Sequence, residues 1–449
     1  MVEAAEGRSD QWPSAEFLQR FAARTHRSKS YRATYGSCLA DSRAAAGFRA
    51  SIKEIQYPIV GDRAAGCRVW DADGNEYIDL AMGFGVQLFG HAAPFIMDSI
   101  RQQLDKGLYL GPQAPLAGTV AQQICGMTGA ERVCFCNSGT EAVMTALRLA
   151  RAGTRRNKIA MFTWSYHGHF DETLARPRTI GGHSHSTPLA PGIAPKFIDD
   201  VLMLDYGEAD CFHSLRAVKD DLAAVIVEPV QSLRPHIQPK AFLHELRQWC
   251  DEHEVALIFD EVLVGFRIHP GGAQAYFGVE ADLATYGKII GGGLPIGVVA
   301  GKAKYLDAID GGNWQFGDKS SPGNPRTFFA GTFNKNPLSM ATAHAVLTKL
   351  EDSGPALQTD LSARTENMAS ELNAFFEANQ IGMSVIHFGS MFRFTGRGNL
   401  DPFFYGLLER GVFLWEGRSC FLSTAHEHAD IAFITKSAKE AALEMCYPC

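Results

Sequence analysis

The stretch Leu257-Ile258-Phe259-Asp260-Glu261, together with the later run Thr285-Tyr286-Gly287-Lys288-Ile289-Ile290-Gly291-Gly292-Gly293, decides the fold of this chain. The first stretch is an apolar run that ends in acid, a pattern typical of a buried strand. Its distance from the second run is the one expected for two neighbouring beta-alpha units. The pairing of a strand-end carboxylate with Lys288 indicates a covalent cofactor site.

A third motif completes this site. Asn137-Ser138-Gly139-Thr140-Glu141 follows the short apolar strand Val133 to Cys136 and precedes a helical run, where amides and hydroxyls can cradle a phosphate. A lysine amine can form a Schiff base with an aldehyde, and a buried carboxylate can keep a ring nitrogen protonated. Pyridoxal 5'-phosphate (PLP) needs both groups. A lone lysine is more often solvated, but order, spacing and strand-end placement agree here.

Composition is that of a soluble enzyme with a large core. The chain has 449 residues, of which 46% are hydrophobic and 20% charged, enough for two domains. Its net charge of -7, without a dense basic run, argues against nucleic acid as the main partner. No apolar run is long enough to span a bilayer and Met1 to Asp10 is polar, so we expect no membrane partner and a cytoplasmic location. Cys446 and Cys449 supply too few ligands for zinc, and no metal is expected.

Strand-like and helix-like runs alternate along the middle of the chain, which favours a mainly parallel sheet flanked by helices. The expected strands are Val133 to Cys136, Ile159 to Trp164, Val201 to Leu204, Ala224 to Val227 and Ala256 to Phe259. The expected helices include Glu141 to Ala152, Phe242 to His253 and a long pattern from Asn336 through Leu350.

Four segments are expected along the chain: an N-terminal extension (1–48), the first part of a small domain (49–110), a large domain (111–335) and a C-terminal small domain (336–449). Trp70 to Asp79 predicts a hairpin with its turn at Asp73-Gly74. The stretches Gly181 to Pro195 and Gly311 to Pro325 are rich in glycine and proline, which is typical of loops.

The chain resembles class III aminotransferases of fold type I, closest to the branch that contains glutamate-1-semialdehyde aminomutase. The resemblance runs from Tyr57 to near the C-terminus. It implies an α/β fold with a mainly parallel sheet in a large PLP-binding domain and a smaller α+β domain built from both termini. The motifs that carry it are Val69 to Asp79, Asn137 to Ala142, Tyr166 to His169, Val227 to Val230, Phe259 to Phe266, Thr285 to Gly297 and Gly331 to Phe333.

A narrower similarity is to the aminotransferase domains of hybrid polyketide and nonribosomal peptide synthetases. Those domains convert a carrier-bound beta-ketoacyl thioester to a beta-amino acyl chain. This chain has no room for a carrier domain, so an acyl carrier protein would act in trans. The segments involved are Leu39 to Arg43, Gly47 to Arg49, Tyr57 to Gly61, Met82 to Gly85 and Trp415 to His426.

The first resemblance implies a role for each motif residue. Lys288 would hold the cofactor as a Schiff base and shuttle a proton between the substrate carbon and the cofactor's C4' atom. Asp260 would pair with the pyridinium nitrogen. Ser138, Gly139 and Thr140 would hold the phosphate, although a simple N-cap satisfies the same pattern.

Further cofactor contacts follow from the same resemblance. Tyr166 would stack on the ring with His167 beside it, Glu228 would face the phenolic oxygen, and Val262 would lie against one face of the ring. Thr332 resembles a threonine that reaches the phosphate from the neighbouring subunit, which implies a homodimer. Ordinary packing is the alternative for the Tyr-His pair and Val262, and a structural role is the alternative for Glu228.

Substrate contacts are expected from four residues. Arg418 would bind a donor carboxylate, while Phe84, Leu88 and Trp164 would line an apolar acceptor pocket. A surface ion pair is the alternative for Arg418, and ordinary core packing is the alternative for the other three.

The sequence thus predicts a PLP-dependent aminotransferase that moves an amino group from an amino acid donor, such as glutamate or glutamine, to a keto or aldehyde acceptor. A beta-ketoacyl thioester in natural-product biosynthesis is one acceptor that fits. Two alternatives stay open: an intramolecular 2,1-aminomutase of the glutamate-1-semialdehyde type, and a PLP-binding sensor or scaffold without turnover.

Overall fold

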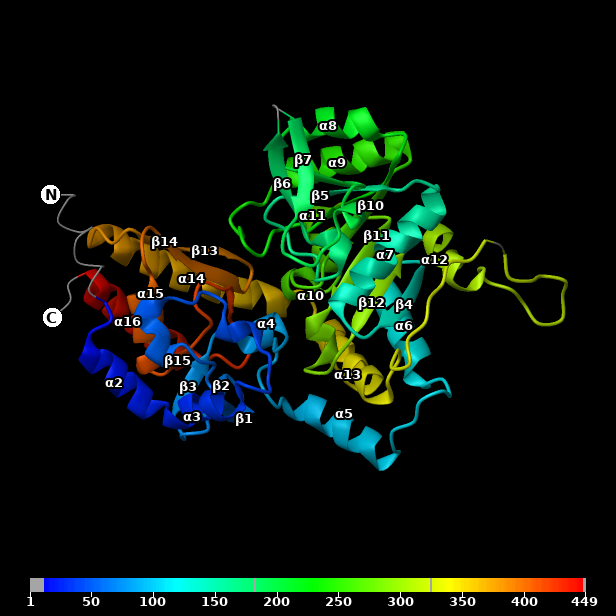
Figure 1. Ribbon diagram of the computed structural model, residues 1–449. Helices are drawn as coiled ribbons and strands as arrows, with labels where there is room; N and C mark the ends of the chain where they lie inside the picture. The colour runs from blue at the N-terminus through cyan, green and yellow to red at the C-terminus, as the bar shows by residue number, and fades with distance from the viewer. Residues whose placement is uncertain (1–11, 181–182, 324, 447–449) are drawn as a thin grey trace. The chain divides into compact units, whose positions relative to one another are not determined.

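The chain folds into two compact units, seen here in a computed structural model that describes residues 12–180, 183–323 and 325–446 (Figure 1). The central unit comprises Pro94–Ser362. The terminal unit comprises Met1–Ala93 and Ala363–Cys449. The limits of the central unit, residues 94 and 362, differ from the limits expected for the large domain, residues 111 and 335. The expected division into four segments stays a prediction.

A seven-stranded sheet forms the middle of the central unit, in the order β4-β12-β11-β10-β9-β5-β8. Only β12 runs antiparallel to its neighbours, which confirms the expected mainly parallel sheet. β9 and β10 are buried along their whole length, as parallel strands covered on both faces are. The strands are β4 (Arg132–Cys136), β5 (Lys158–Phe162), β8 (Val201–Leu204), β9 (Leu222–Val227), β10 (Ala256–Asp260), β11 (Leu283–Gly287) and β12 (Gly297–Gly301).

Helices flank this sheet, and one of them starts at a motif that the sequence singled out. α7 begins after Ser138, whose hydroxyl accepts a hydrogen bond from the Glu141 amide, while the Glu141 carboxylate accepts from the Asn137 amide. This reciprocal capping fixes the start of the helix. The helices are α5 (Pro94–Asp105), α6 (Leu116–Thr128), α7 (Gly139–Thr154), α8 (Cys211–Val218), α9 (Lys240–His253), α10 (Gly265–Ile268), α11 (Gly272–Phe277), α12 (Ala303–Asp310) and α13 (Pro337–Ser353).

Helix α13 explains why the central unit extends past residue 335. It packs against α5 and α6, and its buried face includes Met340, Leu347 and Leu350 (Figure 1). The burial of these side chains joins the helix to the unit that contains the sheet. The next helix, α14 (Ala356–Ala378), continues from the central into the terminal unit.

A polar hairpin corrects one expectation. The stretch Gly181 to Pro195 was expected to be a loop, but β7 (His183–Pro188) pairs antiparallel with β6 (Ala175–Ile180). Residues 181–182 lie outside the described residues. The residues of β7 are mostly polar, so its sequence shows no alternation of apolar and polar residues. The strand forms through backbone pairing with β6, which a sequence pattern does not reveal. The second expected loop is confirmed over 311–323, which contain no helix or strand.

The terminal unit has two small sheets, in the orders β1-β2-β3-β15 and β13-β14-β16, as expected for an α+β domain from both termini. The predicted hairpin is confirmed, with Trp70 opposite Glu76 and Gly74 at φ 87° in the turn. The strands are β1 (Gly61–Ala65), β2 (Arg68–Asp71), β3 (Glu76–Asp79), β13 (Met383–Phe388), β14 (Met391–Gly396), β15 (Val412–Phe413) and β16 (Cys420–Phe421).

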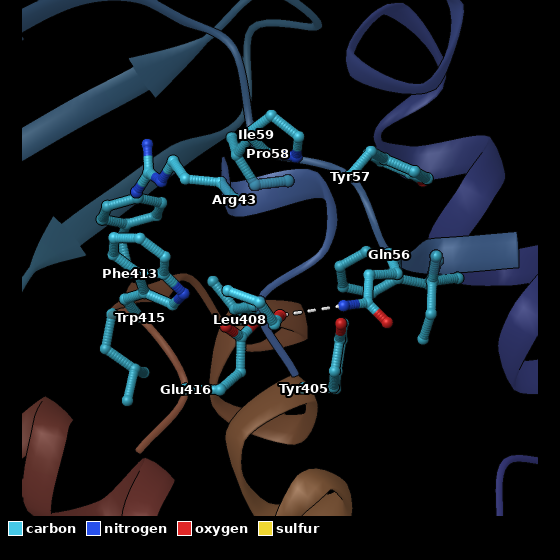
Figure 2. A pocket seen from close by; sticks show the side chains of 14 residues that line it. Arg43, Gln56, Tyr57, Pro58, Ile59, Tyr405, Leu408, Phe413, Trp415 and Glu416 are labelled. Carbon is cyan, nitrogen blue, oxygen red and sulfur yellow. Dashed lines mark hydrogen bonds between the residues drawn. The ribbon is translucent and has the colours of Figure 1, made fainter. Parts of the chain in front are cut away.

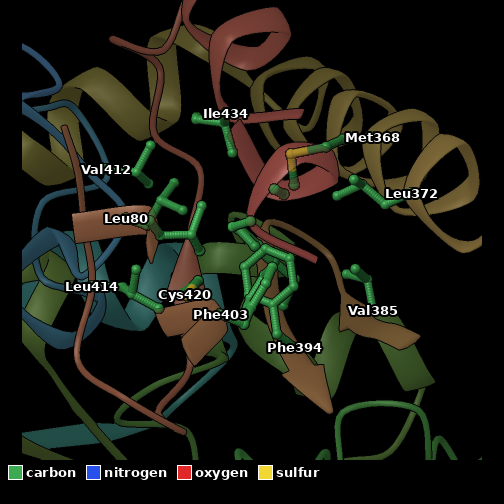
Figure 3. Close-up of a cluster of buried hydrophobic side chains, with 14 of the residues drawn as sticks. Leu80, Met368, Leu372, Val385, Phe394, Phe403, Val412, Leu414, Cys420 and Ile434 are labelled. Atoms are coloured by element: carbon green, nitrogen blue, oxygen red, sulfur yellow. The ribbon is translucent and has the colours of Figure 1, made fainter. Parts of the chain in front are cut away.

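A large hydrophobic core lies within the terminal unit. Leu80, Leu372, Phe403 and Ile434 come from distant parts of the chain and are each fully buried in it (Figure 3). Burial of such side chains is the main stabilising term for a unit of this size. The helices here are α2 (Ala15–Arg24), α3 (His26–Tyr35), α4 (Met82–Gly85), α15 (Asp401–Glu409) and α16 (His428–Cys446).

The first segment of the chain was expected to be an extension, and its described part is folded. Helix α2 buries Phe21 in a cluster with Ile52, Ile55 and Tyr405. Met1 to Asp10 and Cys449 lie outside the described residues. Within the described ranges, no helix combines the length and the apolar character that crossing a membrane requires.

Candidate active site

Three consecutive strands end in the residues that the sequence predicted to be functional. Glu228 follows β9, Asp260 ends β10 and Lys288 follows β11. β10 is parallel to both neighbours, with Phe259 opposite Val227 and Asp260 opposite Thr285. The carboxyl ends of parallel strands meet at one edge of a sheet, which is where ligands bind in open α/β folds.

Lys288 is a buried amine in an uncommon backbone conformation. Burial lowers its pKa to about 8, although the carboxylates of Glu228 and Asp260 act in the opposite direction. Its φ of 45° lies in the left-handed region, which side chains with a Cβ adopt rarely. An amine with this pKa is partly neutral near pH 7 and can therefore attack an aldehyde.

Asp260 is held through both carboxylate oxygens. Its Oδ1 accepts from the Thr285 hydroxyl at 3.1 Å and from the Val262 amide at 3.2 Å, and its Oδ2 lies 2.7 Å from Nδ1 of His167. The side chain is buried. Such bonds fix the direction in which the carboxylate faces. Nε2 of His167 is buried and has no hydrogen-bond partner in the described part of the chain, so it remains available to a bound group.

Glu228 is the second buried carboxylate. Burial raises its pKa to about 7, His167 lowers it, and Asp260 raises it further. Its two oxygens accept from the amides of Tyr166 at 3.0 Å and Ser232 at 3.4 Å. Glu228 therefore joins the end of β9 to the turn that carries Tyr166.

Glycines let the backbone of the phosphate motif approach its neighbours. A Cβ on Gly139 would lie 2.9 Å from Cγ1 of Val262, and a Cβ on Gly297 would lie 2.0 Å from the Ser138 carbonyl oxygen. Side chains at these positions would push the start of α7 away from β10 and β12. The N-terminus of a 16-residue helix attracts a phosphate through its free amides and its dipole.

Thr140 connects this motif to the turn that contains Tyr166 and His167. Its hydroxyl accepts from the His169 amide at 3.4 Å, and Gly168, at φ 88°, approaches it so closely that a Cβ would lie 2.6 Å from Oγ1. Tyr166 is 60% exposed. Its exposed ring can cover a group bound at the start of α7.

Trp164, on the same turn, is 62% exposed and has φ 67°. The sequence did not identify the residue that holds this turn, which is the buried Gln231. Its amide donates to the Thr163 carbonyl at 2.7 Å and to the Ser165 hydroxyl at 2.9 Å. Its only sequence signal is a position three residues after Glu228.

Thr332 is exposed on a turn near the phosphate motif. The turn is tied to that motif by a 3.0 Å hydrogen bond from Nδ2 of Asn137 to Oδ1 of Asn334. Asn137 belongs to the motif that the sequence identified, whereas the role of Asn334 was missed. Phe328 and Phe333 flank Thr332 in sequence, and they are 80% and 59% exposed.

Two of the remaining expected substrate residues, Phe84 and Arg418, belong to the terminal unit and lie beside the indole of Trp415. The Phe84 ring lies 5.2 Å from that of Trp415, and the Arg418 guanidinium lies 5.5 Å from it. No described acidic residue pairs with Arg418, contrary to the surface ion pair considered as its alternative. Leu88 is buried, which fits its alternative as ordinary core.

A pocket lies beside the same indole. Arg43 lies 4.2 Å above the Trp415 ring, and the pocket wall includes Tyr57 and Glu416 (Figure 2). Burial raises the pKa of Glu416. Arg43, Tyr57 and Trp415 all come from segments that carry the narrower similarity, so these segments converge in space within the terminal unit.

The chemistry of the central site fits PLP. It offers a buried amine of lowered pKa for the aldehyde, an oriented carboxylate for the ring nitrogen, and a capped helix start with close glycines for the phosphate. His167 bonds to the same carboxylate through Nδ1, and its buried Nε2 has no partner in the described part of the chain.

Comparison with known proteins gives the same family. The model for aminotransferase class III matches residues 50–426. Glutamate-1-semialdehyde 2,1-aminomutase from Desulforamulus reducens is 35% identical over 84% of this chain and 89% of its own length. An omega-transaminase structure from Sphaerobacter thermophilus is 27% identical with a TM-score of 0.82, covering 94% of this chain and 97% of its own. A transaminase structure with PLP bound is 25% identical with a TM-score of 0.82, covering 94% and 98%. The chain belongs to the class III aminotransferases, a family of PLP-dependent enzymes.

Proposed function

We propose that this chain transfers amino groups at a site built on Lys288, Asp260 and the phosphate motif Ser138 to Thr140. The observation that carries the proposal is the buried Lys288 amine, whose pKa is about 8, at the same sheet edge as Asp260. When bound, PLP supplies an electron-withdrawing ring that acidifies the carbon bearing the amino group.

Each residue has a defined task under this proposal. Lys288 would hold the cofactor through its side-chain amine and, as a free amine, would move a proton to and from the substrate carbon. Asp260 keeps the proton on the ring nitrogen, supported by its bonds to His167 and Thr285. Ser138, Gly139 and Thr140 bind the phosphate.

Three more residues position the cofactor ring. Tyr166 and Val262 flank its faces, and Glu228 faces its phenolic oxygen. Close contact of Val262 with Gly139 and Gly287 supports its place beside the ring, because both glycines adjoin proposed cofactor ligands. The exposure of Tyr166 supports stacking on a group bound at the start of α7.

Two reactions are compatible with this machinery. In the first, an amino acid donor gives its amino group to a separate keto or aldehyde acceptor, such as a beta-ketoacyl chain on a carrier protein acting in trans. The resemblance to transaminase structures supports it. In the second, an intramolecular 2,1-aminomutase moves the amino group within one molecule. The identity of 35% to an aminomutase favours the second reaction more strongly than the first.

The fate of labelled nitrogen separates the two reactions. The PLP-loaded protein is incubated with ¹⁵N-glutamate plus a keto or aldehyde acceptor, and separately with glutamate-1-semialdehyde alone. Transfer of ¹⁵N to the acceptor supports transamination, and conversion of the semialdehyde without any donor supports the aminomutase. Lys288→Ala is the control, and it should abolish both. A protein that binds PLP and does neither would be the non-catalytic binder.

We also propose a homodimer in which Thr332 serves the neighbouring subunit. Exposure of Phe328 and Phe333 beside it supports burial against a second copy. Mixing inactive Lys288→Ala and Thr332→Ala chains tests the idea. If Thr332 acts across the interface, mixed dimers contain one site with both residues intact and regain activity. If activity stays absent from mixed dimers, Thr332 acts within its own chain or not at all.

Substrate selection is assigned to the residues expected from the sequence. Arg418 binds the donor carboxylate, and Phe84 and Trp164 each offer apolar surface to the acceptor. The absence of a described acid partner for Arg418 supports its use by an anionic ligand.

A cytoplasmic location is also proposed for the chain. The described cysteines are free thiols, which is in keeping with a reducing compartment.

A further inference from the structure

A cavity of about 320 Å³ opens at the opposite edge of the catalytic sheet, within the size range of small-molecule sites. Val255, before β10, and Asp282, before β11, contribute to its wall. These two strands run from the cavity to Asp260 and Lys288, so the cavity and the cofactor site occupy opposite ends of the same strands. The ends of α7 and α9 and the first turn of α12 complete the wall.

Most charges around this cavity are already paired. Arg247 donates to Asp251 at 2.7 Å and to Asp282 at 2.8 Å. Asp282 also accepts from Lys302 at 2.7 Å and from the Leu257 amide at 2.9 Å. These groups therefore form a neutralised network at the base of the cavity.

Arg156 differs from these groups because backbone carbonyl oxygens, and no carboxylate of the described residues, hold its guanidinium. Its Nη1 donates to the carbonyl oxygens of His253 at 3.0 Å and of Leu222 and Glu254 at 3.3 Å. In the described ranges no carboxylate pairs with it. Carbonyl contacts orient a guanidinium but leave its positive charge uncompensated, which is the arrangement that an anion binds.

Lys304 adds a second cation. Its Nζ lies 4.8 Å from the Tyr305 ring centre and 3.8 Å from Oδ1 of Asp282, an oxygen that Lys302 already occupies at 2.7 Å. The cavity wall carries three basic side chains (Arg156, Arg247 and Lys304) and three acidic ones (Asp251, Glu254 and Asp282), and Lys302 adjoins the wall through its bond to Asp282. Arg156 and Lys304 are the bases of the wall that are not closely paired, since Arg156 contacts only carbonyl oxygens in the described ranges and Lys304 lies 3.8 Å from a carboxylate oxygen that Lys302 already occupies.

We infer that this cavity binds a small organic anion, whose carboxylate or phosphate groups contact Arg156 and Lys304. Glu254 is the group that opposes such a ligand, because it lines the cavity as an exposed carboxylate. Removing its charge should therefore strengthen binding. Because the cofactor site lies at the other edge of the sheet, binding requires neither loss of PLP nor a free Lys288.

The test is calorimetric titration of the PLP-loaded protein, with pyrophosphate as the phosphate probe and glutarate as the carboxylate probe. One site per chain is expected for at least one probe. Arg156→Gln should weaken binding roughly tenfold, the loss of one charge-assisted contact. Arg155→Gln is the matched control, since this neighbouring arginine is exposed and does not line the cavity.

The pattern of variants decides the outcome. Glu254→Gln should tighten binding, and Lys304→Gln should weaken it even if Arg156→Gln proves too unstable to load PLP. Equal effects of Arg156→Gln and Arg155→Gln would show general charge attraction only and would overturn the inference. So would the absence of binding of both probes to the wild-type protein, or an unchanged affinity in Lys304→Gln.

Discussion

Covalent attachment of PLP should require the neutral amine of Lys288, so the pH dependence of the attachment rate should follow the lowered pKa of this residue. Apoprotein is mixed with PLP at a series of pH values, and the attachment rate is read from the growth of the cofactor's absorption band. With a pKa of about 8, the neutral amine rises from roughly 9% at pH 7 to roughly 90% at pH 9. The rate should therefore rise roughly tenfold and then level off.

An ordinary lysine would behave differently. With a pKa of 10.5, the neutral fraction would rise roughly 100-fold between pH 7 and pH 9 and would continue to rise above pH 10. The sign follows from the chemistry, because only the deprotonated amine attacks the aldehyde. A rate that still climbs steeply above pH 10 would refute the claim that burial controls this amine.

Variants of nearby and distant acids sharpen the test. Glu228 raises the pKa of Lys288, so Glu228→Gln should move the midpoint of the rate profile to lower pH. Glu280→Gln, which removes an exposed acid that does not affect Lys288, should leave the midpoint unchanged. Lys288→Ala should abolish the covalent band at every pH.

Three further outcomes are expected. Asp260→Asn should lower kcat roughly 100-fold or more, as loss of a preorganised charge does, with stopped-flow absorbance as the assay. Gly297→Ala should weaken PLP binding in equilibrium dialysis because the new Cβ would lie 2.0 Å from the Ser138 carbonyl oxygen, whereas Gly126→Ala, which meets open space, should not. Trp415→Ala should raise KM for the substrate and leave the PLP dissociation constant unchanged, because Phe84 and Arg418 contact its ring.

The sheet was predictable because parallel strands that are buried on both faces have continuous apolar sequences. Each residue of β9 and β10 is buried, so both strands read as unbroken apolar runs with a polar residue at the end. Strand β7 has no such apolar run. Its polar residues are held by backbone pairing with β6, and nothing in their order requires a strand.

The motif residues of the site were predictable for a related reason. Asp260 ends β10, Lys288 follows β11 directly and Ser138 stands two residues after β4, so the local pattern places all three at the carboxyl edge. Gln231, Thr285 and Asn334 act through hydrogen bonds to residues between 25 and 197 positions away. The sequence pattern does not reveal such contacts, because they depend on how the strand ends are arranged in space.

The same logic separates cofactor binding from substrate selection. Every residue assigned to PLP within one chain belongs to the central unit, where neighbouring strands of one sheet fix its position. Two of the three residues assigned to the substrate, Arg418 and Phe84, are grouped instead around Trp415 in the terminal unit, whereas the third, Trp164, belongs to the central unit. Substitutions in the terminal unit can therefore change which molecule is accepted while the sheet edge keeps the buried amine and its carboxylate in place. If Arg418 and Phe84 select the substrate as proposed, selectivity can change without any change to the residues that hold the cofactor.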